Sequence, residues 1–135
     1  MIPKPRADLK PNTADFERYP LVKPTGFREY DARWLFPEEI NLMGLNAVGM
    51  GVATLFARRG VPKRIIVGHD YRSYSAQVKQ ALMTGLLAGG CEVHDIGLAL
   101  SPMAYYAQSA LDVEGAAMVP ASHNDTGWPG IKMRL

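Results

Sequence analysis

The stretch Lys63–Ile96, KRIIVGHDYRSYSAQVKQALMTGLLAGGCEVHDI, decides the fold because it reads as a complete strand–helix–strand unit. Residues 63–68 are a short β-branched run, which predicts a buried strand that ends in a polar loop. Residues 75–88 then show helical spacing, with Ser75 expected as the N-cap and Gly89-Gly90 as the stop. Residues 91–96 predict the next strand. The expected buried stripe of this helix is Val78, Leu82, Gly85 and Leu86.

Helical and strand patterns continue on both sides of this unit. Before it, a helix is expected to start after Phe36, with Pro37 at its first position and Gly60 as a left-handed cap. After it, Ser101-Pro102 predicts the start of a helix through about Leu111, with Ser101 as N-cap, and residues 115–119 and 131–135 predict two more strands. The first helix is expected to bury Ile40, Met43, Ala47, Met50 and Thr54, and its glycines Gly44, Gly49 and Gly51 suggest close packing against a neighbour.

Strands that alternate with helices argue for a sheet that is covered on both faces. The last connection is different, because residues 120–130 form an eleven-residue loop without a helix, so the last strand should return antiparallel. The expected fold class is α/β, a three-layer α/β/α domain with a small mixed, mostly parallel four-stranded sheet. Residues 1–24 contain five prolines and are expected to form an arm or an extended cover without core residues, ahead of a domain at residues 25–135.

The composition narrows the possible functions. The chain has 135 residues, 47% of them hydrophobic, and its formal net charge of +2 gives no electrostatic footprint for nucleic acid. The single cysteine, Cys91, cannot form an internal disulfide, and no apolar run is long enough to cross a bilayer. We therefore expect a cytoplasmic protein without a nucleic-acid or membrane partner.

Two polar loops follow expected strand ends, where open α/β sheets bind ligands. One contains His69, Asp70, Tyr71 and Arg72, and the other, ASHNDTGWPG at residues 121–130, contains Ser122. The second loop is either an ordinary polar turn or a loop that presents a reactive hydroxyl. A serine hydrolase is a weak interpretation, because His123 is adjacent to the serine and no Gly-x-Ser-x-Gly elbow surrounds it.

Other charged residues leave alternatives open. Lys132 suits an anionic substrate or a proton transfer, but it also fits a solvated lysine on a strand. The segment GFREYDARW at residues 26–34 places a carboxylate between two arginines, as in a phosphate clamp or a structural ion pair. The three histidines lie on separate segments, so their spacing predicts no metal site. No nucleotide-binding glycine motif is present.

Together, four segments resemble the α-D-phosphohexomutases, the phosphomannomutase/phosphoglucomutase family. FREYDAR at residues 27–33 is similar to the family segment F-R-x-Y-D-x-R-G, and VGHDYRSYS at residues 67–75 to V-G-R-D-x-R-x-S. The Ser-Pro-Met run that ends in Tyr105-Tyr106 resembles the segment with Thr-Pro. ASHNDTGWPGIK resembles the active-site loop T-A-S-H-N-P-x-x-x-N-G-x-K. The departures include Trp34 for glycine, His69 for arginine, Asp125 for proline and Pro129 for asparagine.

The resemblance implies a function. In the family, the loop serine is a phosphoserine that exchanges its phosphoryl group with a hexose phosphate through a 1,6-bisphosphate, so the group moves between O1 and O6. Ser122 would be this carrier, and its phosphate would bind Mg²⁺. Lys132 and Arg33 match residues that assist proton transfer and hold charge near the serine. Tyr30, His123 and Asn124 match neighbours of that site, and Asp70 and Arg72 match a supporting loop.

The family enzyme has four domains, and this chain resembles only the first. The family's metal-binding Asp-x-Asp-x-Asp run does not occur in this sequence. Mg²⁺, hexose phosphates such as glucose or mannose phosphate, and domains II–IV are therefore expected partners of a full-length enzyme. The isolated chain is expected to be inactive and to self-associate through uncovered faces. The alternative is a stand-alone, non-catalytic domain that binds sugar phosphates or another protein.

Overall fold

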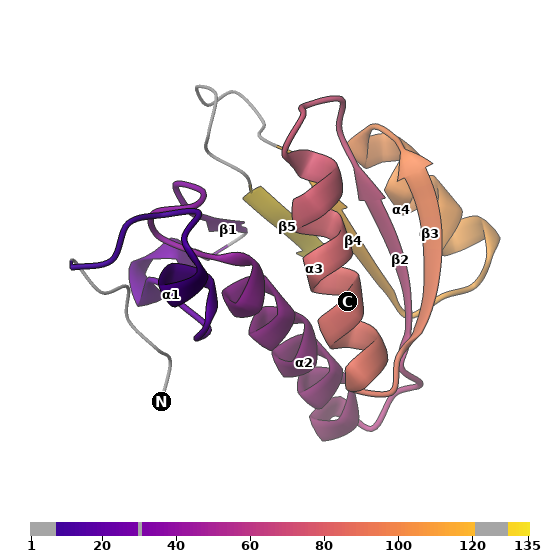
Figure 1. The fold of residues 1–135 in the computed structure, drawn as a ribbon. Coiled ribbons are helices and arrows are strands. Elements are labelled where there is room, and N and C mark those ends of the chain that lie inside the picture. The colour runs from indigo at the N-terminus through magenta and orange to yellow at the C-terminus, as the bar shows by residue number, and fades with distance from the viewer. Residues whose placement is uncertain (1–7, 30, 121–129) are drawn as a thin grey trace.

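A five-stranded mixed sheet forms the centre of the computed structural model, which describes residues 8–29, 31–120 and 130–135 (Figure 1). The strand order is β1-β5-β4-β2-β3. Strand β2 is parallel to β3 and β4, whereas β5 is antiparallel to β4 and β1. The elements along the chain are α1 (Ala14–Glu17), the 3-10 helix η1 (Pro24–Gly26), β1 (Ala32–Arg33), α2 (Leu42–Arg59), β2 (Arg64–His69), α3 (Ser75–Ala88), β3 (Glu92–Leu98), α4 (Ser101–Ala110), β4 (Gly115–Val119) and β5 (Gly130–Arg134).

This arrangement confirms the expected three-layer α/β/α class and the antiparallel last strand, but the expected strand count was wrong. The missing strand is β1, which has only two residues and pairs with β5 through Ala32 opposite Ile131 and Arg33 opposite Gly130. A two-residue strand is too short to show alternation, so the sequence pattern could not reveal it.

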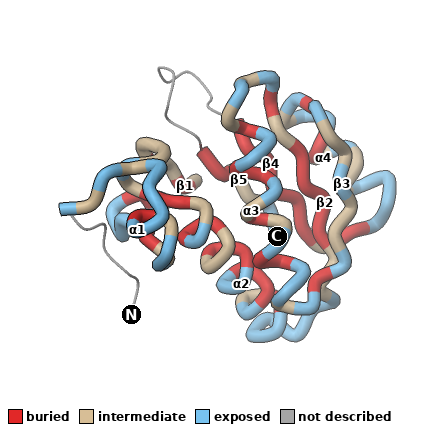
Figure 2. Tube along the Cα trace, in the orientation of Figure 1, coloured by how far each residue is buried: buried red, intermediate tan, exposed pale blue. Residues whose placement is uncertain are grey.

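The hydrophobic core lies on both faces of the sheet. On one face, Ile65 and Val67 of β2 pack with side chains of α2 and α3, including Phe56 and Leu82. On the other face, Met118 of β4 packs with residues of α4 and the segment before it. Figure 2 shows the buried central strands between more exposed outer surfaces. No helix of the part of the chain that the structure describes is long and apolar enough to span a membrane.

Helix α2 begins at Leu42, so the expected start at Pro37 was wrong. Residues 36–39 form a turn instead, and Asn41 is the N-cap, with its Oδ1 accepting from the Gly44 amide at 2.7 Å. Asn41 is 0% exposed. Its Oδ1 also accepts from the Leu21 amide at 2.9 Å, and its Nδ2 donates to the carbonyls of Phe16 and Tyr19. This side chain therefore caps α2 and also fixes the preceding segment to it.

Of the three α2 glycines expected to pack closely, Gly49 lies against α3 and Gly44 against Leu21, whereas the expectation was wrong for Gly51, which has open space around it. A Cβ on Gly85 of α3 would lie 1.9 Å from the Asn46 carbonyl oxygen, and one on Gly49 of α2 would lie 2.3 Å from that of Leu82. At the end of α2, Gly60 adopts the expected left-handed cap with φ 66°. The expected buried stripe of α3 is confirmed.

The expected buried stripe of α2 was largely wrong. Met43, Met50 and Thr54 are exposed, and Ala47 is only half-buried. Ile40 is buried but precedes the helix. The residues that α2 buries are Gly44, Leu45, Val48, Gly49, Val52, Ala53 and Phe56. Both sets have helical spacing, so periodicity alone could not say which face meets α3.

Two expected N-caps were also wrong by one residue. Tyr74 precedes α3 and Leu100 precedes α4, so Ser75 and Ser101 are the first helical residues. Ser75 does not cap the helix. Its Oγ instead donates at 2.5 Å to the carboxylate of Asp70, which lies in the loop after β2.

The segment before β1 adds buried side chains, which corrects the expectation of a cover without core residues. Phe16, Leu21 and Val22 are all buried. Trp34, which replaces the glycine of the family pattern, is also buried, and its indole Nε1 donates to the Lys23 carbonyl at 2.8 Å. Gly26 makes room for this ring, since a Cβ there would lie 2.0 Å from Nε1. The tryptophan therefore closes the core between β1 and the preceding segment.

Candidate functional site

Several candidate residues lie along one edge of the sheet. Because β5 is antiparallel to its neighbours, the carboxyl ends of β1, β4 and β2 lie beside the amino end of β5. Arg33 ends β1, Val119 ends β4 and His69 ends β2. Ligands of open α/β sheets bind at this edge. The predicted residues Ser122, His123, Asn124 and Tyr30 lie outside the described residues.

Backbone hydrogen bonds hold the positions on either side of residues 121–129 together. The Gly130 amide donates to the Pro120 carbonyl at 2.7 Å, so the end of β4 and the start of β5 are adjacent. The Asp70 amide donates to the Val119 carbonyl at 3.1 Å. Strands β2 and β4 are paired, so the two polar loops follow neighbouring strands.

Asp70 organises the loop after β2. Its Oδ2 accepts from Nη1 of Arg72 at 2.6 Å, while its Oδ1 accepts from the Arg72 amide at 3.2 Å and from the Ser75 hydroxyl. The carboxylate is buried, and these bonds compensate for its lost hydration. The neighbouring carboxylate raises the pKa of the Arg72 guanidinium above its ordinary value. The network gives this loop a defined shape beside the end of β4.

Arg33 and Lys132 point to the same face of the sheet. Ala32 and Ile131 are paired and lie in the core shared with α2 and α3, so their neighbours point to the opposite face. Lys132 is opposite Met118, which packs on the α4 side. Arg33 and Lys132 occupy diagonal positions, typically about 7–8 Å apart between Cα atoms. Both are half-buried and can direct positive charge toward one anion.

The carboxylate between the two arginines of residues 26–34 makes an ion pair with one of them. Asp31 Oδ2 accepts from Arg33 Nε at 2.7 Å, and the side chain of Arg33 passes close to Gly130. The structural ion pair that the sequence left open is therefore present. This ion pair uses one N–H donor of Arg33, and a guanidinium has four others that can bind an anion. Asp31 instead holds the guanidinium beside the start of β5.

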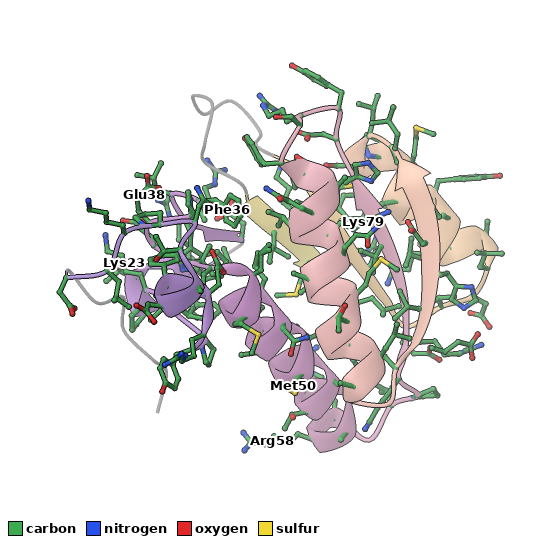
Figure 3. The ribbon with its side chains drawn as sticks, viewed as in Figure 1. Lys23, Phe36, Glu38, Met50, Arg58 and Lys79 are labelled. Atoms are coloured by element: carbon green, nitrogen blue, oxygen red, sulfur yellow. The ribbon has the colours of Figure 1, made fainter. Side chains whose placement is uncertain are left out.

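An ion pair that the sequence did not reveal joins helix α3 to strand β3. Lys79 of α3 is buried, and its Nζ donates to both carboxylate oxygens of Asp95 on β3 at 2.7 Å (Figure 3). Burial alone would raise the pKa of Asp95, but bonds from Lys79 and the Gly97 amide outweigh it and hold the pKa below its ordinary value. The two partners are sixteen residues apart, so no local motif marks them. The pair ties α3 to the edge strand.

A protein site for Mg²⁺ needs several oxygen ligands close together. Within residues 8–29, 31–120 and 130–135, no group of three or more His, Cys, Asp or Glu side chains is arranged to hold a metal ion. The described residues therefore do not by themselves form a carboxylate cage for Mg²⁺.

The sequence of this chain matches a known protein family and several of its members. Residues 24–135 match the family described as phosphoglucomutase/phosphomannomutase, alpha/beta/alpha domain I. A phosphoglucomutase/phosphomannomutase of Thermococcus kodakarensis is 35% identical over 108 residues, which are 79% of this chain and 24% of the relative. A phosphomannomutase of Escherichia coli is 35% identical over 113 residues, 84% of this chain and 24% of the relative. A probable phosphoglucosamine mutase of Pyrococcus furiosus is 37% identical over 109 residues, 81% and 22% of the two chains.

Solved structures agree with these relatives. A phosphoglucomutase/phosphomannomutase family protein of Burkholderia thailandensis superposes with a TM-score of 0.78 at 26% identity, covering 84% of this chain and 26% of that one. A putative phosphomannomutase of Thermus thermophilus gives a TM-score of 0.74 at 27% identity, covering 80% and 25%. The chain thus spans about a quarter of the length of the relatives that it matches. It belongs to the phosphoglucomutase/phosphomannomutase family and corresponds to the α/β/α domain I of that family.

Proposed function

We propose that this chain is the phosphoryl-carrying domain of a phosphohexomutase, with Ser122 as the carrier. The family membership supports the reaction class, and the segment ASHNDTGWPGIK supports the serine. The observation that carries the proposal is the frame around residues 121–129. Pro120 and Gly130 are hydrogen-bonded, Arg33 lies opposite Gly130, and Asp70 is bonded to Val119.

The proposed reaction has two transfers. In the first, the bond between phosphorus and Ser122 Oγ breaks, and the phosphoryl group forms a bond to a hydroxyl oxygen of a hexose monophosphate, whose proton is released to water. The resulting 1,6-bisphosphate then returns its other phosphoryl group to Ser122 Oγ, which leaves the phosphate moved between O1 and O6. Such transfers depend mainly on alignment and charge stabilisation rather than on covalent help from the protein.

Arg33 and Lys132 have distinct proposed roles in these transfers. The guanidinium of Arg33 would hold negative charge on the phosphoryl group. Lys132 would donate a proton to Ser122 Oγ when the phosphoryl group leaves and take it back when the group returns. Asp70 and Arg72 would act as positioning residues, because their network is bonded to the strand that leads into the serine loop.

The remaining parts of the activity are proposed to reside elsewhere in a full-length enzyme. The match to about a quarter of each relative suggests that the sugar is enclosed by further domains, which would also supply the carboxylates for Mg²⁺. The preferred hexose phosphate would be decided there. The isolated chain is therefore proposed to have little or no mutase turnover.

A coupled mutase assay tests this proposal with the purified chain, Mg²⁺, a hexose 1-phosphate and a trace of hexose 1,6-bisphosphate. The expected result is no turnover by a chain that circular dichroism shows to be folded. Turnover that is lost in Ser122→Ala would show that the chain assembles a complete site, which contradicts the need for further domains. Turnover that persists in Ser122→Ala would contradict the carrier role itself.

A further inference from the structure

His69 is the last residue of β2, and the chain on both sides of this strand is bonded to it or to the next residue. Its carbonyl accepts from the Ala99 amide at 2.9 Å, just after β3. The following amide, that of Asp70, donates to the Val119 carbonyl at the end of β4. The end of β2 therefore joins the edge strand to the strand that leads into residues 121–129.

The imidazole of His69 has a polar atom that the fold leaves unsatisfied. Its Nδ1 is buried and makes no hydrogen bond, although the side chain as a whole is only half-buried. An unpaired buried polar atom costs free energy, and most such atoms in folded proteins are paired. The cost points to a state of the ring in which this nitrogen has a partner.

The nearest acceptor of suitable charge is the carboxylate of Asp95. Side chains alternate along β2, so His69 lies on the same face as Val67, which is opposite Asp95 in the sheet. Burial would raise the pKa of Asp95, whereas Lys79, the Gly97 amide and the positive charge of His69 lower it. The two side chains are therefore within electrostatic reach of each other.

Asp95 can accept one more hydrogen bond. A carboxylate offers about four acceptor positions. Three bonds occupy it at present, two from Lys79 Nζ at 2.7 Å and one from the Gly97 amide at 2.8 Å. A protonated imidazole donates from both ring nitrogens, so protonation turns Nδ1 of His69 into a donor for the remaining position.

The other charges near His69 are balanced. The titratable and charged groups of the neighbouring elements are Lys79 of α3, Asp95 of β3, and Asp70, Tyr71, Arg72 and Tyr74 of the loop after β2. Strand β4 adds none, because Gly115–Val119 has no ionisable side chain. Lys79 is paired with Asp95, and Arg72 with Asp70. A protonated imidazole would add one positive charge to this edge of the sheet.

We propose that His69 is a positioning residue that, when protonated, binds Asp95 and fixes the end of β2 for phosphoryl transfer at Ser122. This role rests on the proposed function. It acts through the backbone bond from Asp70 to Val119, which connects the end of β2 to the strand before Ser122. His69 stands where the family pattern has arginine, whose charge is permanent, whereas histidine gains or loses its charge between about pH 5 and 8. Transfer in this chain should therefore slow as the pH rises through that range.

The test measures the rate at which a hexose 1,6-bisphosphate labels Ser122, with wild type and His69→Arg compared at each pH. Other titrating groups, including Lys132, affect both proteins, so the ratio of the two rates isolates position 69. The ratio of wild type to His69→Arg should be near one at about pH 5.5 and fall at least about threefold by about pH 8. A ratio that does not change with pH would overturn the role of His69.

Two glutamine variants complete the experiment, after circular dichroism shows that each is folded. His69→Gln cannot become charged, so it should be slower than wild type at about pH 5.5 and equal to it at about pH 8. This comparison decides the matter even where His69→Arg does not fold. His94→Gln is the matched control, because His94 is on β3 opposite Ile66, which packs on the α4 side.

The ratio of wild type to His94→Gln should not vary with pH, and a change equal to that of His69→Gln would overturn the proposal. The outcomes also separate the two levels of inference. No label on Ser122 in any variant at any pH would refute the proposed function, and the role of His69 with it. Label on Ser122 with the same pH profile in wild type, His69→Arg and His69→Gln would refute the role of His69 alone.

Discussion

Lys132 lies two residues into β5, on the face of the sheet that it shares with Arg33. If it moves the proton at Ser122 Oγ, its removal should slow phosphoryl transfer without unfolding the chain, because its side chain is only half-buried. Lys132→Met is expected to slow the labelling of the chain by a hexose 1,6-bisphosphate at least about tenfold. The rate is read by intact mass spectrometry over time.

Arg134 provides the matched control for this prediction. It lies on the same face of the same strand but farther from the start of β5 at Gly130. Arg134→Met should label at nearly the wild-type rate. Equal slowing in both variants would indicate a general effect of charge or strand stability, and Lys132 would then lose its proposed role.

A second residue-scale prediction concerns stability. Asn41 is fully buried, and its side chain accepts from two amides and donates to two carbonyls. Asn41→Ala would remove a helix cap and leave several buried groups unpaired, so a loss of about 2–4 kcal/mol in the free energy of unfolding is expected. Urea unfolding measures it. Thr54→Ala, an exposed change on the same helix, should stay within about 0.5 kcal/mol, and a similar loss there would refute the assignment.

At the scale of elements, the contact between α2 and α3 depends on glycine. Gly85→Ala would place a methyl group on the Asn46 carbonyl and force the helices apart, which should cost about 3 kcal/mol. Gly51→Ala is the opposite case, since nothing lies within 4 Å of its added methyl group. It should stabilise the chain by about 0.5–1 kcal/mol through better helix propensity. Thermal unfolding of both variants at low concentration checks the pair, and shifts of the same sign would contradict this packing.

The elements also show how much the sequence pattern could predict. The alternation of strands and helices, the antiparallel β5 and the buried stripe of α3 follow from local periodicity and loop length, and the structure confirms them. Strand β1 could not be predicted because two residues show no period. The buried face of α2 could not be chosen because both faces are apolar. In each case the answer depends on a partner that is distant in the sequence.

The sequence likewise predicted some features of the candidate site and missed others. The structure shows that β2 and β4 are paired, so the two polar loops follow neighbouring strands at one edge of the sheet, where ligands of open α/β sheets bind. The bond from Ser75 to Asp70 was not predicted because Ser75 was expected to cap α3, and the bond from Lys79 to Asp95 was not predicted because no motif joins the two residues. Ser122, His123, Asn124 and Tyr30 remain predictions.

For the molecule as a whole, carboxylates predict the response to acid. Arg64 lowers the pKa of Glu114 through hydrogen bonds, and Lys23 and Lys79 outweigh burial to lower the pKa values of Glu39 and Asp95. A carboxylate with a lowered folded pKa stabilises the fold above its unfolded pKa, near 4, and loses this contribution as the pH falls through the folded value. Glu17 opposes this trend, because burial raises its pKa.

Thermal unfolding should therefore shift to lower temperature as the pH falls from about 5 to 3. Asp95→Asn should reduce the size of that shift, because it removes one of the three stabilising carboxylates. It should also lower stability near neutral pH, where Lys79 would remain buried without its counter-charge. An unfolding temperature that rises toward pH 3, or an unchanged shift in Asp95→Asn, would contradict this electrostatic account.

The most direct measurement of the central claim is the position of the phosphate on the chain. Folded protein is incubated with Mg²⁺ and a hexose 1,6-bisphosphate for hours, because one transfer per molecule is enough for detection even where turnover is too slow. Peptide mapping by mass spectrometry then locates the label. The account predicts a single phosphate on Ser122 and none in Ser122→Ala. No label on Ser122 after exhaustive incubation, or equal labelling of Ser122→Ala, would contradict it.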